Sequence, residues 1–241
     1  MCIRDRNKSI HEAFGAGDFE KESLQLLQQL FQKFNILLMV GGSGLYAKAL
    51  MEGLDIFPKI TETAINIVSE LYQSSGIEGL QKTLEEKDPV YYKSVDRFNP
   101  RRLIRALEVC ETMQKPYSSF LGQSVKERFF KSQTLLLTRP RAQLYERINK
   151  RVERMVKEGI EKEVQSLYPF RELSALQTVG YSEWFDHFKG KFTREDTVAE
   201  IQKNTRRYAK RQITWFQKID TTPISIQDWK PTLEQAILKI G

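Results

Sequence analysis

The stretch from residue 36 to residue 46 reads Ile-Leu-Leu-Met-Val-Gly-Gly-Ser-Gly-Leu-Tyr. A short apolar run that ends in glycines is typical of a buried strand in a parallel sheet, and it predicts a strand at residues 36–40. Residues 41–44 then form a turn, and residues 45–54 read as a helix that ends near Gly53. This order of strand, turn and helix predicts an α/β fold.

The rest of the chain predicts one more strand and many helices. A second buried strand is expected at residues 134–138, and the tract 59–123 reads as helices with loop breaks, one of them started by Asn99 and Pro100. We therefore expect a parallel-sheet core that carries a mostly helical insertion domain. The expected division is 7–58 and 131–241 for the core and 59–130 for the insertion. Further helices are expected at 9–34, 141–158, 160–168, 193–216 and 231–240.

The turn at residues 41–44 has the residue types that suit a phosphate. Glycines let a backbone approach a ligand closely, and the start of the following helix offers free N–H groups and partial positive charge. Ser43 adds a hydroxyl donor. The segment matches neither the Walker form nor the dinucleotide fingerprint. A tight structural turn is therefore the alternative that remains open.

Composition excludes several classes of protein. The 241 residues include 40% hydrophobic and 29% charged residues, as in globular proteins. The longest apolar run, residues 36–40, is far shorter than the roughly 20 residues of a spanning helix. Two cysteines, Cys2 and Cys110, are too few for a disulfide framework, so we expect a cytoplasmic protein. Two histidines that lie far apart in the sequence argue against a zinc site.

The net charge of +7 is concentrated in two stretches that are poor in acids. Residues 97–105 hold four arginines and no acid, and residues 200–218 hold six basic residues and one acid. On a helix the second stretch forms a cationic stripe, with Ile201, Tyr208 and Trp215 on the opposite side to pack on a core. Like charges on one face repel, so this pattern fits either a solvated face or a contact with phosphates. The members of the stripe are Lys203, Arg206, Arg207, Lys210 and Arg211.

Four segments, in order over roughly residues 8 to 218, resemble the signatures of one enzyme family. They are Val40–Tyr46, Asn99–Val109, Leu176–Tyr181 and Thr205–Phe216. The family is that of the tRNA dimethylallyltransferases, or tRNA isopentenyltransferases. The resemblance implies a P-loop NTPase-like core and transfer of a dimethylallyl group from dimethylallyl diphosphate to N6 of adenosine 37, beside the tRNA anticodon. It also implies Mg²⁺ to help hold the diphosphate, and the anticodon stem-loop of tRNA as partner.

The resemblance assigns roles to particular residues. Ser43 stands where the family usually has threonine, so its hydroxyl would act beside the reacting groups as the catalytic residue. Gly41, Gly42 and Gly44 would line the donor channel. Two segments would contact tRNA: Arg101, Arg102, Leu103, Ile104 and Arg105, and then Arg206, Arg207, Tyr208, Ala209, Lys210 and Arg211.

The sequence departs from the family at several positions. The family begins with a P-loop followed by an Asp-Ser motif whose Asp is the expected general base, and residues 1–8 contain neither. Ile65 and Ser182 stand where basic residues are common. The absence of the P-loop and of the Asp-Ser motif predicts a family member without its first strand, P-loop and base, with little or no transfer activity as it stands. The changes at Ile65 and Ser182 weaken only the transfer of roles to these two positions. We expect a monomer that binds no membrane.

Two other functions remain open from the sequence. One is a non-catalytic RNA-binding protein that retains the basic surfaces of the family. The other is a relative of the nucleoside-phosphate kinases, which would transfer phosphate from ATP without needing tRNA.

Overall fold

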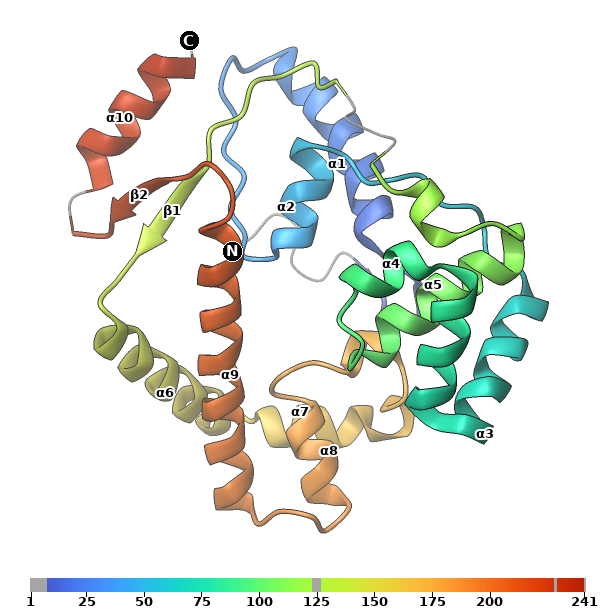
Figure 1. The fold of residues 1–241 in the computed structure, drawn as a ribbon. Helices are drawn as coiled ribbons and strands as arrows, with labels where there is room; N and C mark the ends of the chain where they lie inside the picture. The colour runs from blue at the N-terminus through green and yellow to red at the C-terminus, as the bar shows by residue number, and fades with distance from the viewer. Residues whose placement is uncertain (1–7, 123–126, 228, 241) are drawn as a thin grey trace. The chain divides into compact units, whose positions relative to one another are not determined.

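The structure is a computed structural model that describes residues 8–122, 127–227 and 229–240. It is mostly helical, with one small parallel sheet (Figure 1). The α-helices and strands in chain order are α1 Ala16–Phe31, α2 Gly44–Met51, α3 Glu62–Lys87, α4 Pro89–Ser94, α5 Pro100–Met113, β1 Leu135–Thr138, α6 Arg141–Lys157, α7 Ile160–Leu167, α8 Ser182–Phe188, α9 Arg194–Phe216, β2 Thr222–Ser225 and α10 Trp229–Ile240. Short 3₁₀ turns occupy Tyr117–Phe120, Tyr168–Phe170 and Ser174–Leu176.

The sheet consists of β1 and β2, which run parallel with Leu135 opposite Thr222 and Thr138 opposite Ser225. The two arrows in Figure 1 point the same way. The strand expected at residues 134–138 is thus confirmed as β1. A mixed α/β class is confirmed as well, in the form of a helical chain with a two-stranded parallel sheet.

The strand predicted at residues 36–40 is wrong. The segment has no regular secondary structure, and the side chains of Leu38 and Val40 are 76% and 75% exposed. A strand requires ladder hydrogen bonds to a neighbouring strand, and no described residue pairs with this segment. Apolar character alone therefore does not make residues 36–40 a strand.

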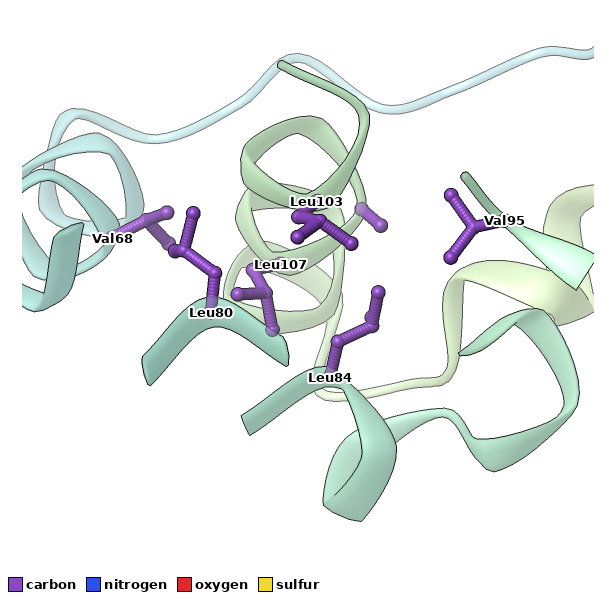
Figure 2. Packing of buried hydrophobic residues seen from close by; sticks show 7 residues of the cluster. Val68, Leu80, Leu84, Val95, Leu103 and Leu107 are labelled. Carbon is purple, nitrogen blue, oxygen red and sulfur yellow. The ribbon is translucent and has the colours of Figure 1, made fainter. Parts of the chain in front are cut away.

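The chain divides into two compact units, Glu52–Arg128 and the combination of Met1–Met51 with Phe129–Gly241. The sequence-based division at residues 58 and 130 stays a prediction. In the unit Glu52–Arg128, helix α5 packs on α3, which bends at Gly76 with a φ of 60°. Its core is formed by Val68, Leu80, Leu84, Val95, Leu103 and Leu107, whose side chains converge in Figure 2.

The other unit has its own core between α6, α7, α8 and α9. Trp184 and Val164 are fully buried there, and Ile201 brings α9 into the same cluster. Two predicted helices, at residues 141–158 and 160–168, agree with α6 and α7 to within one residue at each end. This core fixes α9, the helix that carries the cationic stripe.

Candidate functional site

The glycine turn lies at the start of α2, in the unit that contains α9. The carbonyl of Ser43 accepts a hydrogen bond from the Ala47 N–H at 3.0 Å, and the Ser43 side chain is exposed. The first N–H groups of a helix have no partner within it, so α2 directs such donors to the side where Ser43 lies. Gly41, Gly42 and Gly44 all have ordinary φ angles, so the turn does not need glycine for its backbone conformation.

Contacts with helix α9 explain why two of these three positions hold glycine. Gln212 donates from Nε2 to the Gly42 carbonyl at 2.7 Å. A Cβ placed on Gly42 would lie 2.3 Å from that nitrogen, and one placed on Gly44 would lie 2.2 Å from the indole of Trp215. A Cβ on Gly41 would meet nothing within 4 Å. Gly42 and Gly44 thus admit α9, whereas Gly41 faces open space.

Helix α9 begins at a side-chain cap, because Thr193 Oγ1 accepts from the Asp196 N–H at 3.1 Å. Its five-membered stripe of cations divides into two groups. Lys203 forms an ion pair with Glu200, and Arg206 donates to Asn149 Oδ1 of α6 at 2.8 Å while lying 5.9 Å from the Tyr145 ring centroid. The cations that remain exposed are Arg207, Lys210 and Arg211.

The expectation that Tyr208 packs on a core is wrong. Its side chain is 43% exposed, and the Arg211 guanidinium lies 5.7 Å from the ring centroid. Ile201 is buried as expected, Trp215 is half-buried against the glycine turn, and Ala209 is half-buried. The apolar side of α9 therefore ends after its first two turns, and its carboxyl half contacts the turn instead.

The second set of candidate residues lies on α5, in the unit Glu52–Arg128. Asn99 caps the helix by accepting from the Arg102 N–H at 3.4 Å, and Pro100 is its first residue, both as predicted. The side chains of Arg101, Arg102 and Arg105 are exposed, whereas Leu103 is fully buried and Ile104 packs against the core. Leu103 can therefore serve an interface only by anchoring the helix that carries the arginines.

Aromatic rings hold Arg105 in place. Its guanidinium lies 5.7 Å from the Phe57 ring centroid, and Phe57 stacks on Tyr117 with 4.9 Å between centroids and 9° between planes. Burial raises the pKa of the Tyr117 hydroxyl, and the nearby Tyr91 adds to this shift, so the phenol of Tyr117 is neutral. Burial also raises the pKa of Glu108, against the opposing attraction of Arg105.

The segment Leu176–Tyr181 connects to α9 through a buried carboxylate. Gly180 has a φ of 98°, a conformation that glycine adopts without strain. Its N–H donates to Glu183 Oε2 at 2.8 Å, and Glu183 Oε1 accepts from Asn204 of α9 at 2.8 Å. Ser182, where the family commonly has a basic residue, donates to the Thr178 carbonyl. Ile65, the other departure, lies 44% exposed on α3.

The donor set for a metal ion is sparse. Within residues 8–122, 127–227 and 229–240, no three His, Cys, Asp or Glu side chains are grouped as metal ligands. None of the described helices is long and apolar enough to cross a membrane.

Two solved structures show what this arrangement is similar to. The full-length tRNA isopentenylpyrophosphate transferase from Bacillus halodurans matches with a TM-score of 0.59 and 31% identity, over 90% of this chain and 69% of that one. A eukaryotic dimethylallyltransferase acting on tRNA has a TM-score of 0.70 at 22% identity, over 90% and 57% of the two chains, and supports the fold alone. This chain is thus similar in fold to transferases that act on tRNA.

Sequence relatives narrow the class to one family. The pattern of the family described as IPP transferase matches residues 7–219. The tRNA dimethylallyltransferase of Christiangramia forsetii is 51% identical over 87% of this chain and 70% of its own length. That of Flavobacterium psychrophilum is 46% identical over 90% and 73%. The chain belongs to the IPP transferase family, a family of prenyl-transferring enzymes.

Sequence reasoning missed the partners that hold the site together. The contacts of Gln212 with Gly42, and of Asn149 and Tyr145 with Arg206, join elements far apart in the sequence. The glycines at positions 42 and 44 were the available signal of a close approach. The sequence predicts room for a ligand at these glycines, whereas the structure places α9 against Gly42 and Gly44.

Proposed function

We propose that this chain transfers the dimethylallyl group of dimethylallyl diphosphate to N6 of adenosine 37 in tRNA. The observation that carries the proposal is the hydrogen bond from Gln212 to Gly42, which joins the turn bearing Ser43 to the helix bearing exposed Arg207, Lys210 and Arg211. Membership in the IPP transferase family supports the same reaction.

The reaction displaces diphosphate from an allylic carbon, so negative charge develops on the leaving group. Preorganised N–H and O–H donors stabilise such charge, and we assign this role to the Ser43 hydroxyl and to the backbone of Gly41, Gly42 and Gly44. The target adenine must leave its stack to reach the donor. With this function we also propose a P-loop NTPase-like core, as the family resemblance implies.

We assign the tRNA contacts to the two helices with exposed arginines. The candidates on α5 are Arg101, Arg102 and Arg105, and those on α9 are Arg207, Lys210 and Arg211, all with exposed side chains. Arg206 donates a hydrogen bond to Asn149 of α6, so we assign it a role in holding α9 in place and not in direct contact with RNA. Such cations bind the phosphate backbone and make affinity dependent on salt.

Magnesium is part of the proposal only through the resemblance. Mg²⁺ commonly binds through one or two carboxylates plus substrate phosphates, and would there neutralise the departing diphosphate. The described residues offer no cluster for it, so no step is assigned to the ion. A cytoplasmic location and a monomeric state are proposed with the function, from the cysteine content and the family resemblance.

Labelled transfer tests the proposed function. The chain, and the same chain preceded by a P-loop segment, are incubated with radiolabelled dimethylallyl diphosphate and an anticodon stem-loop with adenosine at position 37. Label on N6 of that adenosine is expected with both proteins, weakly with the chain alone and strongly with the extended protein. Ser43→Ala should reduce the rate by roughly 100- to 1000-fold, since one stabilising hydrogen-bond donor is lost. Salt-sensitive binding of the stem-loop without any transfer by the extended protein would instead favour a non-catalytic RNA-binding protein.

A further inference from the structure

We infer that Gln212 and Trp215 are positioning residues for the transfer reaction. They clamp the glycine turn to α9, so one helix sets the position of the turn relative to the cations that face RNA. The inference rests on the proposed function, because the proposed function gives the glycine turn a role in holding dimethylallyl diphosphate. Neither residue is assigned contact with a substrate.

The hydrogen bond from Gln212 fixes a peptide plane. The peptide between Gly42 and Ser43 is trans and planar, so its C=O and its N–H point in opposite directions. Because the Gly42 carbonyl is directed toward Gln212 at 2.7 Å, the Ser43 N–H is directed away from α9. Gln212 thereby orients a backbone donor next to the Ser43 hydroxyl, which is exposed.

Trp215 fixes the next residue by its volume. The indole lies where a Cβ of Gly44 would be, with three ring carbons within 2.5 Å of that position. The first turn of α2 therefore rests directly on the ring face, and a rigid aromatic side chain gives little room for it to shift. Gln212 and Trp215 are three residues apart, so they lie on the same side of α9.

The same helix presents the cations at a fixed spacing. An α-helix rises about 1.5 Å per residue, so Arg207 lies about 7.5 Å along the axis from Gln212. Lys210 and Arg211 lie within one turn of Gln212. An RNA backbone bound by these cations would therefore be held at a set distance from the Ser43 turn, without a flexible linker between the two.

The test separates the hydrogen bond from packing and from RNA binding. Gln212→Met keeps the length and most of the volume of the side chain but removes the donor. Gln217→Met makes the same change at the exposed C-cap residue of α9 and serves as the matched control. Three quantities are measured on the 241-residue chain: amide hydrogen exchange of residues 42–46, the Kd for dimethylallyl diphosphate, and the Kd for the stem-loop.

Gln212→Met is expected to speed amide hydrogen exchange at residues 42–46. It should also weaken the binding of dimethylallyl diphosphate roughly 3- to 10-fold, the range for one net hydrogen bond. Stem-loop affinity should stay within about twofold, a result that a general loosening of α9 would not give. Gln217→Met should change none of the three quantities.

Unchanged exchange in Gln212→Met would overturn the inference. So would faster exchange together with donor affinity equal to that of the unsubstituted chain. If the unsubstituted chain binds no donor while Gln212→Met still loosens the turn, the proposed donor site fails and the clamp itself is upheld.

Discussion

Helices α5 and α9 both carry an arginine-rich segment, but they are held in different ways. Helix α5 buries one continuous face, with Leu103, Ala106, Leu107, Val109 and Cys110 all inaccessible or nearly so. Helix α9 buries only Thr197 and Ile201, near its amino end, and its carboxyl half contacts the glycine turn through Gln212 and Trp215. Helix α5 is thus a platform, a helix fixed by its own buried face that displays cations, whereas α9 combines exposed cations with contacts to the proposed reaction site.

The largest expected difference between the two helices is in the free energy of unfolding that is lost when one side chain of each is truncated. Leu107→Ala removes a fully buried side chain from the core shown in Figure 2 and should lower the free energy of unfolding by about 2–5 kcal/mol. Tyr208→Ala on α9 removes a side chain that is 43% exposed and should cost less than about 1 kcal/mol. Urea unfolding followed by circular dichroism measures both, and equal costs would contradict the platform description of α5.

The next largest effect on stability concerns the packing of the glycine turn on α9, a contact that has no counterpart on α5. Gly44→Ala places a methyl group against the Trp215 indole and should lower the free energy of unfolding by about 1–3 kcal/mol. Gly41→Ala, with open space around its Cβ, is the matched control and should stay within about 0.5 kcal/mol.

The double variant Gly44→Ala with Trp215→Ala identifies the cause. Because the ring is the atom group that the methyl would meet, the two changes should cost less together than the sum of their separate costs. Strict additivity would show that the ring is not what requires glycine at position 44.

How far the sequence predicts each helix follows from where its contacts lie. Helix α5 was predictable because its start is local, in Asn99 and Pro100, and because Leu103, Leu107 and Cys110 repeat at helical spacing. The partner of Gln212 is 170 residues away in sequence, so no local pattern indicates that contact. Tyr208 was misplaced for the same reason: periodicity gives its side of the helix, but whether another element covers that side depends on tertiary packing.

The glycine turn and the strand before it show the same limit. The residue types at positions 41–44 indicate a close approach, which the structure confirms, but they do not indicate that the approaching group is the protein's own α9. The apolar run at 36–40 indicates burial, yet a strand also needs a paired neighbour, and Leu38 and Val40 are exposed. Residue type predicts local preference, and the identity of the neighbour does not follow from it.

The salt dependence of stem-loop binding should distinguish the cations that contact RNA from those that bond within the protein. Arg207→Ala and Lys210→Ala on α9, and Arg101→Ala on α5, should each reduce the slope of log affinity against log salt by about one unit. Arg206→Ala should change the slope less and lower the free energy of unfolding by about 1 kcal/mol, because its hydrogen bond to Asn149 is internal. A full unit of slope lost in Arg206→Ala would show that it contacts RNA as its neighbours do.

The smallest effect is electrostatic and belongs to α5 alone in this comparison. Burial raises the pKa of Glu108 above its ordinary value near 4.5, while Arg105 opposes the shift. A carboxyl group whose pKa is raised by folding contributes stability below the unfolded pKa and loses it as pH rises through the folded pKa. Relative to Glu108→Gln, the unsubstituted chain should therefore lose stability as pH rises from about 4 to 7, by about 0.5 kcal/mol or less since the group is partly solvated.

Arg105→Ala sharpens this last test, because it removes the attraction that favours the charged form of Glu108. The loss of stability with rising pH should become larger in that background and should vanish when Glu108→Gln is added. Chemical unfolding at a series of pH values measures all four proteins. A loss that does not grow in Arg105→Ala would mean that the arginine is directed wholly to solvent and to the Phe57 ring, and that the cations of α5 are free of the acidic side chain beside them.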